Sequence, residues 1–148
     1  MRCAILFIFG AVAILPASAQ DRKIAQDKSM LFGTWKVAAE ERDGRRLRAK
    51  EIGVRMVLIS PTTLVFQDGE GQTDMAARYD LDSSTKPWQI ALTFTKGEHK
   101  GKKTKGIVQF EFEAATLRVC YGKPGEDAPE DFTSKQNQSY FTLQPAGK

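Results

Sequence analysis

The sequence predicts an all-β protein in which about eight antiparallel strands follow one another in up-and-down order and close into a barrel. Three observations support this fold class. Short segments of alternating apolar and polar residues recur along the chain, turn-forming residues such as Asp43-Gly44 separate them, and a Gly33-x-Trp35 sequence opens the first segment. A barrel of eight strands is just wide enough for side chains or one small ligand. An open sandwich is the alternative architecture.

Residues 1–19 have the pattern of a signal peptide. Arg2 supplies the positive charge, residues 4–15 form an apolar run, and Ala17-Ser18-Ala19 is a typical cleavage site. The apolar run is shorter than the roughly 20 residues that a membrane-spanning helix needs. We therefore expect an exported protein, periplasmic or secreted, with no membrane span after cleavage before Gln20. Retention of the segment as an anchor is the alternative.

The mature chain is expected to form one domain, with residues 20–30 as a polar lead-in and residues 31–148 as the barrel. Gly33 permits a tight bend at the start of the first strand, residues 34–41. Trp35 is expected to cover the floor of the barrel, where its indole N–H needs a partner. The inward set is predicted to be Trp35, Val37 and Ala39, and the outward set to be Thr34, Lys36 and Glu40.

The later strands are predicted from the same alternation of residues. They are residues 54–60, 64–67, 75–82, 88–95, 107–113, 116–121 and 140–144. In the segment 107–113, Val108, Phe110 and Phe112 share one face. Residues 96–106 are predicted to be a basic loop, and residues 122–131 a loop rich in glycine, proline and acidic side chains.

Three stretches carry a resemblance to one family. They are residues 31–44, beginning L-F-G-T-W-K-V; residues 79–92, with Y-x-L-D-x-x-x-K-P-x-x-I-x-L; and residues 117–135, beginning L-R-V-C-Y-x-x-P-G. Together they resemble the uncharacterised lipocalin-like domain family catalogued mainly from planctomycetes, over nearly the whole mature chain. The resemblance implies an exported lipocalin-like β-barrel with no established activity and no catalytic residues. It also implies a packing role for Cys120, because the family pattern has a cysteine there.

The residue inventory argues against an enzyme, a metal site or a cofactor. The single histidine, His99, lies in a lysine-rich loop that would not hold a catalytic base in place, so we expect a surface side chain. Cys120 is the one cysteine outside the signal segment. Its apolar neighbours predict burial, with an intermolecular disulfide or a reactive thiol as alternatives. One histidine and one cysteine cannot form a zinc site, and the acidic segments 68–71 and 126–131 lack the spacing of a calcium loop.

The charge balance is mildly basic. The 22 lysines and arginines oppose 18 acidic residues, which does not indicate a nucleic-acid-binding protein. Export and the absence of aromatic residues among the lysines of residues 96–106 argue the same way. These lysines could instead meet an anionic component of the cell envelope, although a solubilising loop is the alternative. The candidate residues are Lys100, Lys102, Lys103 and Lys105.

The inward aromatic residues suggest a function. Those expected to line a ligand cavity are Tyr79, Trp88, Phe94 and Phe110. The leading hypothesis is therefore a non-enzymatic protein that binds a small apolar or amphipathic molecule in the barrel. The same aromatic side chains could instead fill the barrel as its core. The alternative function is then a plugged barrel that acts as an envelope or protein-interaction module through loops 96–106 and 122–135.

Overall fold

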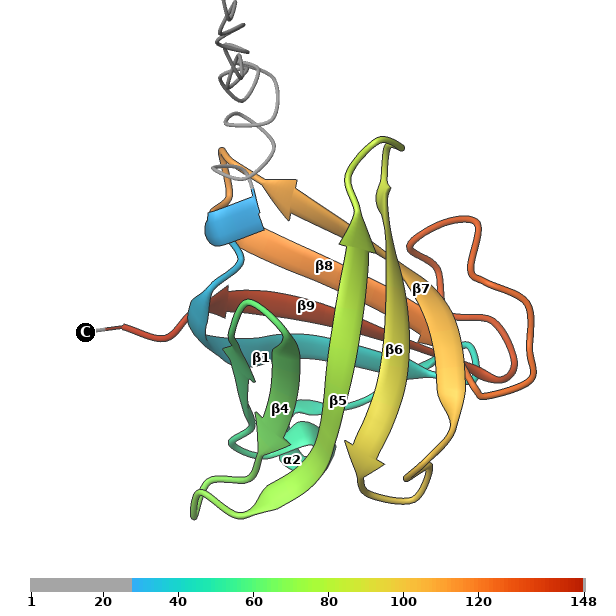
Figure 1. The fold of residues 1–148 in the computed structure, drawn as a ribbon. Coiled ribbons are helices and arrows are strands. Elements are labelled where there is room, and N and C mark those ends of the chain that lie inside the picture. Colours follow the sequence, from blue (N-terminus) through green and yellow to red (C-terminus); the bar gives the residue numbers. More distant parts are fainter. Residues whose placement is uncertain (1–27, 148) are drawn as a thin grey trace, which may run out of the picture.

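Eight strands pair in a closed ring in the computed structural model, which describes residues 28–147 (Figure 1). In order around the ring they are β1 (Gly33–Arg42), β3 (Met56–Ile59), β4 (Thr63–Gln67), β5 (Thr73–Asp82), β6 (Trp88–Lys96), β7 (Lys103–Glu111), β8 (Thr116–Gly122) and β9 (Gln138–Pro145). All pairings are antiparallel, and β9 pairs with β1 to close the ring. The predicted fold class is confirmed. The predicted signal peptide and most of the polar lead-in lie outside the described residues.

Two small elements lie between β1 and β3. Strand β2 (Arg45–Arg46) extends β1 as a hairpin, through a turn in which Asp43 and Gly44 both have positive φ. The helix α2 (Ala49–Ile52) is a single turn whose Ile52 is buried in the core. The predicted Asp-Gly turn is therefore confirmed. Within residues 28–147, no helix has the length and apolarity needed to cross a bilayer.

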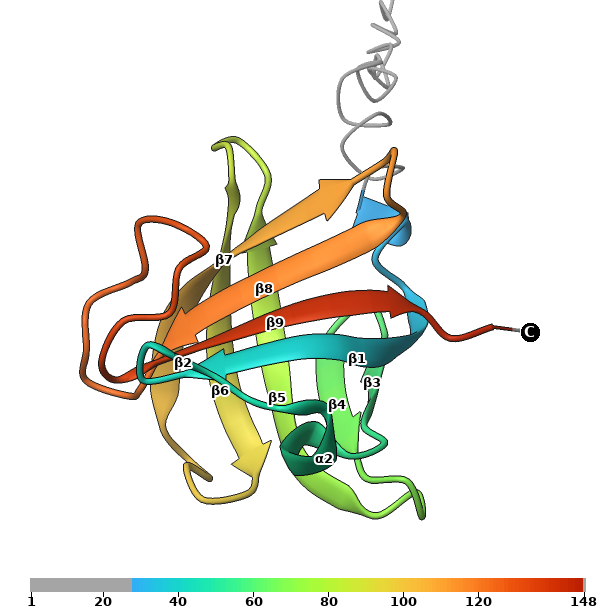
Figure 2. The ribbon, with the colours of Figure 1, turned by 180° about the vertical axis from the view of Figure 1, so that it is seen from behind.

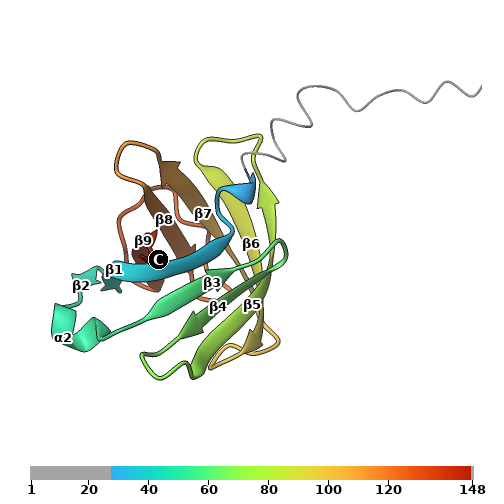
Figure 3. The ribbon, with the colours of Figure 1, turned by 90° about the vertical axis from the view of Figure 1, so that its left-hand side faces the viewer.

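The up-and-down order places the connections at two opposite ends of the barrel (Figures 1, 2 and 3). We call one the Trp35 end; it has the start of β1 and the turns 60–62, 83–87 and 112–115. We call the other the Glu40 end; it has the segment 43–55, the turns 68–72 and 97–102, and the long loop 123–137.

The Trp35 end is closed by the first residues of the described chain. Trp35 is buried, and its indole nitrogen donates to the Leu31 carbonyl at 2.9 Å. Leu31 is buried too, and Gly33 enters the strand at φ 134°, a conformation that L side chains rarely adopt. The Trp35 ring also contacts Phe110 edge-on at 6.2 Å between centroids. These contacts place the tryptophan over the end of the core with its polar atom paired.

A β-bulge in β1 overturns one part of the predicted alternation. Val37 pairs with Leu143 and Ala39 with Thr142, so Ala38 is an extra residue without a partner in β9. After the bulge the inward positions change, and Glu40, which the sequence pattern assigned to solvent, faces the interior and is buried. Ala39, assigned to the interior, is only half-buried.

The interior of the barrel is filled. Side chains from all around the ring form one apolar cluster, and the largest fully buried ones include Phe66, Phe94, Leu92, Leu117 and Leu143. The interior space beside Leu31 and Tyr79 amounts to about 10 Å³, about the size of a single water probe. Aromatic side chains therefore fill the centre of this barrel as core residues.

Strand β7 differs from its predicted bounds at both ends. It begins at Lys103, because residues 103–105 pair with β6 and lie in the sheet, so the basic loop is confined to residues 97–102. It stops at Glu111, and Phe112 lies in the following turn with 69% of its surface exposed. The prediction that Phe112 shares the inward face of Val108 and Phe110 is wrong.

The loop 123–137 covers part of the outside of the barrel. Ile107 and Cys120 are paired across β7 and β8 and are buried, although they lie outside the interior cluster. The loop is tied to the β1–β2 turn, since Ser134 Oγ accepts from the Gly44 amide at 2.9 Å. The predicted burial of Cys120 is confirmed, and this burial raises the pKa of its thiol to about 12.

Candidate functional site

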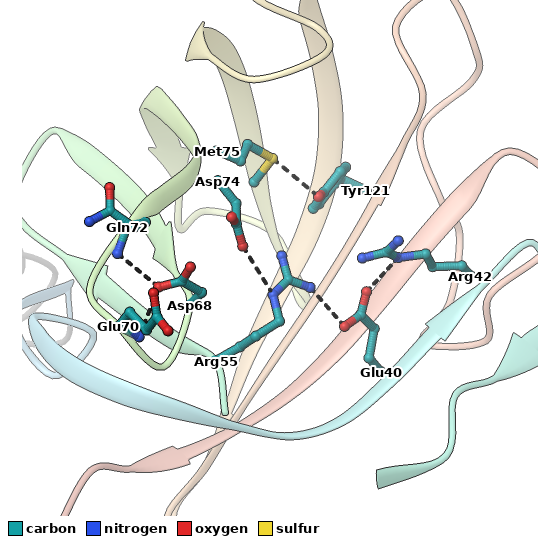
Figure 4. Close-up of polar contacts among 9 residues, drawn as sticks. All are labelled: Glu40, Arg42, Arg55, Asp68, Glu70, Gln72, Asp74, Met75 and Tyr121. Carbon is teal, nitrogen blue, oxygen red and sulfur yellow. Dashed lines mark hydrogen bonds and ion pairs between the residues drawn. The ribbon is translucent and has the colours of Figure 1, made fainter. Parts of the chain in front are cut away.

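A charged cluster lies at the Glu40 end, inside the ring of strands (Figure 4). The Glu40 side chain is completely buried, and its two carboxylate oxygens accept from different arginines. Arg42 Nε donates to Oε1, and Arg55 Nη1 donates to Oε2 at 2.9 Å. Because a buried carboxylate without partners is strongly unfavourable, these two contacts are what allow Glu40 to face inward.

The two arginines differ in exposure. The Arg42 side chain is 51% exposed and that of Arg55 is 16% exposed. Arg55 lies 5.4 Å above the ring of Phe66, and its Nε is 3.7 Å from Asp74 Oδ2. The aromatic ring and the more distant carboxylate therefore hold Arg55 in place, whereas Arg42 reaches toward solvent.

Tyr121 lies beside this cluster. Its hydroxyl donates to Met75 Sδ at 3.6 Å, and its ring stacks on Phe141. Burial, followed by the Glu40 carboxylate, raises the pKa of Tyr121 to about 12. The phenol therefore keeps its proton and remains a hydrogen-bond donor.

In the nearby turn 68–72, the Asp68 carboxylate is hydrogen-bonded to backbone amides of the turn itself. Asp68 Oδ1 accepts from the amides of Glu70 and Gln72 at 2.9 and 2.8 Å (Figure 4). The Asp68 carboxylate therefore stabilises the turn. No group of three or more histidine, cysteine or acidic side chains in the described part of the chain is placed to hold a metal ion.

A groove of about 440 Å³ opens at the Trp35 end. Its lining is mainly apolar and comes from the start of the described chain, the turn before β6, and β7 with the turn that follows it. The lining residues are Met30, Ser83, Lys86, Pro87, Trp88, Val108, Gln109, Phe110 and Phe112. Phe110 and Phe112 meet edge-to-face at 4.9 Å, so the exposed ring extends the core aromatic residues to the surface.

The four predicted ligand-binding residues separate into two pairs. Trp88 and Phe110 line this groove together. Tyr79 and Phe94 are buried inside the barrel instead: the Tyr79 hydroxyl donates to the Ser60 carbonyl at 2.6 Å, and the Phe94 ring packs against Tyr121 and His99. Tyr79 and Phe94 therefore fill the barrel as core residues, which is the alternative that the sequence analysis left open.

The basic residues predicted to meet an anionic partner lie around the β6–β7 turn. Lys100 and Lys102 are in the turn, and Lys103 and Lys105 are on β7 facing outward, because Thr104 between them is buried. All four are exposed, and none forms an ion pair with another described residue. His99 is half-buried with its ring 5.6 Å from that of Phe94, so the expected surface histidine is partly packed.

Sequence reasoning missed the residues that the structure brings together most closely. Glu40 and Arg42 lie on β1, Tyr121 lies on β8, and Arg55 lies in the loop before β3, so no local pattern links them. The one signal in the sequence is that Glu40 and Arg42 are charged and lie at the end of β1, whose earlier inward residues are apolar. Met30 and Phe112 were also missed as groove residues.

Comparison with protein-family models, curated proteins and solved structures gives no match to this chain. The resemblance to the lipocalin-like family therefore stays a prediction, and the functional argument depends on the geometry of the site.

Proposed function

We propose that this protein is an exported, non-enzymatic binder of a small apolar or amphipathic molecule, and that the molecule binds in the groove at the Trp35 end. The observation that carries the proposal is the exposed apolar lining of that groove, where Met30 and Phe112 lie at the surface. Its volume of about 440 Å³ lies within the usual range for small-molecule sites, whereas the interior space beside Leu31 and Tyr79 is about 10 Å³. The binding surface is therefore at the end of the barrel and not at its centre.

The lining of the groove supports an amphipathic ligand. Phe112 and Met30 expose apolar surface there, and burial of such surface favours binding. Lys86 lies among the lining residues, is exposed, and forms no ion pair with another described residue. A ligand with an apolar chain and an anionic head group would meet both features.

Tryptophan fluorescence provides a direct test, because Trp88 lines the groove. Dodecanoate is the probe, with decyl alcohol as the uncharged counterpart. Saturable quenching or a spectral shift is expected, and Phe112→Ala should weaken dodecanoate binding roughly tenfold through lost apolar contact. Val54→Ala is the matched control, since Val54 is exposed but lies outside the groove. Equal affinity in the two variants would refute the groove as the site.

A second candidate function is attachment to an anionic envelope component through the basic residues of the β6–β7 turn. It is favoured by the row formed by Arg78, Thr93 and Lys103 on adjacent strands, which continues the lysines of the turn across the sheet. Replacing Lys100, Lys102, Lys103 and Lys105 by glutamine should reduce retention on anionic vesicles at low salt. Unchanged retention would eliminate this function.

A further inference from the structure

Strand β7 extends past its partner β6 at the Trp35 end of the barrel. The pairing of the two strands reaches Val108, which lies opposite Trp88, the first residue of β6. Strand β7 continues to Glu111, and its residues 109–111 pair with β8 alone. The edge of β7 that faces β6 is therefore unpaired beyond Val108, and it borders the apolar groove.

The backbone of Phe110 faces this open edge. In an antiparallel strand, the N–H and C=O groups of successive residues point alternately to the two neighbouring strands. The Phe94 amide donates to the Lys102 carbonyl at 2.9 Å, so Phe94 and every second residue of β6 bond toward β7. The register then directs the backbone of Val108 to β6, and that of Phe110 to the same side, where β6 no longer runs. No hydrogen bond from another described residue reaches the Phe110 N–H or C=O on this side.

The groove surrounds this open backbone with two further kinds of group. Apolar surface comes from Met30, Trp88 and Phe112. A positive charge comes from Lys86, which lies in the turn before β6, so the groove separates it from Phe110 on β7. A molecule in the groove therefore meets apolar side chains, one lysine, and one backbone N–H and C=O that lack partners.

A fatty acid matches only part of this set. Its chain covers the apolar side chains and its carboxylate accepts hydrogen bonds, but it has no N–H for the Phe110 carbonyl. In an N-acyl amino acid, the amide N–H and the carboxylate flank one carbon atom, as the N–H and C=O of a strand residue do. Such a molecule can donate to the Phe110 carbonyl and accept from the Phe110 N–H, as a paired strand residue does.

The open edge is short, which favours a small molecule over an extended peptide. The Phe112 carbonyl, two residues beyond Phe110, already accepts from the Ala115 amide at 3.2 Å. A peptide strand would gain hydrogen bonds from one residue of β7 only, whereas strand addition to a sheet depends on several. A single amino acid joined to an apolar chain uses the whole of the open edge.

We propose that the groove binds N-acyl amino acids. The amide N–H donates to the Phe110 carbonyl, the carboxylate lies between the Phe110 N–H and Lys86, and the acyl chain covers the apolar side chains. The negative carboxylate complements the lysine, and the hydrogen bonds satisfy both open backbone groups. This inference rests on the function proposed above, because it concerns the same groove, and it narrows the class of ligand.

Tryptophan fluorescence of the mature chain with three probes tests the inference. Dodecanoate reports whether the groove binds an amphipathic molecule. N-nonanoylglycine has a chain of the same length that includes the N–H, and nonanoyloxyacetate has an ester oxygen in place of that N–H. N-nonanoylglycine should bind about fivefold more tightly than the ester. Equal affinity of these two, with dodecanoate bound, would overturn the inference and leave the groove function standing. If none of the three probes binds, both proposals are wrong.

Nitrogen-15 spectra locate the contact on the backbone. During titration with N-nonanoylglycine, the Phe110 amide proton should move downfield and its shift should saturate. The amides of Gln109 and Glu111 are internal controls that should change little, because they face β8. Shifts of equal size at all three amides, or none at Phe110, would refute the proposed hydrogen bonds.

Two lysine variants test the position of the carboxylate. Lys86→Gln should weaken binding of N-nonanoylglycine several-fold, and the fold should survive because this side chain is exposed. The matched control is Lys96→Gln, since Lys96 is an exposed lysine at the other end of β6 and outside the groove. Equal affinity in the two variants would refute the contact between the carboxylate and Lys86.

Discussion

At the Trp35 end, Leu31 and the indole of Trp35 cover the core with apolar surface, and the aromatic residues continue outward to the exposed ring of Phe112. At the Glu40 end, a buried carboxylate and two arginines occupy the interior instead. The first end therefore leaves apolar surface exposed to solvent, whereas the second holds its charged groups in ion pairs with one another. The difference between the two ends lies in the side chains that cover them, because the centre of the barrel between them is packed.

The largest expected effect tests whether the centre between the two ends is solid. Phe94→Ala should lower the free energy of unfolding by about 3–5 kcal/mol, because Phe94 is almost fully buried and its removal leaves a cavity. Phe112→Ala should change it by less than about 0.5 kcal/mol, because that ring is mostly exposed. Urea unfolding of both variants measures the difference. A small effect at Phe94 would mean that the interior is loosely packed.

The next effect tests the charged end. Glu40→Ala should cost about 3 kcal/mol, because it leaves Arg55 nearly buried without its closest anion. Glu41→Ala, one residue along the strand and free of ion pairs to other described residues, is the control and should be close to neutral. Urea unfolding at neutral pH measures both. Similar losses of unfolding free energy in the two variants would contradict the inward, ion-paired position that the β-bulge gives Glu40.

The smallest effect concerns alkaline pH. The pKa of Tyr121 is raised from 10.0 to about 12 in the folded chain, so the unfolded chain loses this proton first as the pH rises. The folded state should therefore lose stability above pH 10, by about 1 kcal/mol at pH 11. Tyr121→Phe should remove that part of the pH dependence. The buried Cys120 acts in the same direction from about pH 9, so both proteins are compared in a Cys120→Ala background.

Most strands could be predicted because their signals are local. The segments predicted at 75–82 and 88–95 lie within β5 and β6, where alternating residues face a packed interior on one side and solvent on the other. Gly33, Trp35 and the Asp43-Gly44 turn are also local signals. Their backbone requirements are set by the residue types themselves, so no distant partner is needed to recognise them.

The candidate site could not be predicted in the same way. The inward direction of Glu40 depends on a bulge opposite β9, whose residues lie about a hundred positions later in the chain. The placement of Lys103 and Lys105 in a strand likewise depends on pairing with β6. A register shift reverses the faces of a strand without changing its composition, so alternation alone cannot reveal it.

The sequence by itself determined the all-β class, the up-and-down order, the turn at Asp43-Gly44 and the burial of Cys120, because residue types and their spacing set these features locally. Only the tertiary structure decided that the barrel is filled, that Glu40 turns inward between two arginines, and that Phe112 opens a groove at the opposite end. These features arise from the register in which distant strands pair and from the volumes of side chains that meet across the barrel, and both are properties of the closed sheet as a whole.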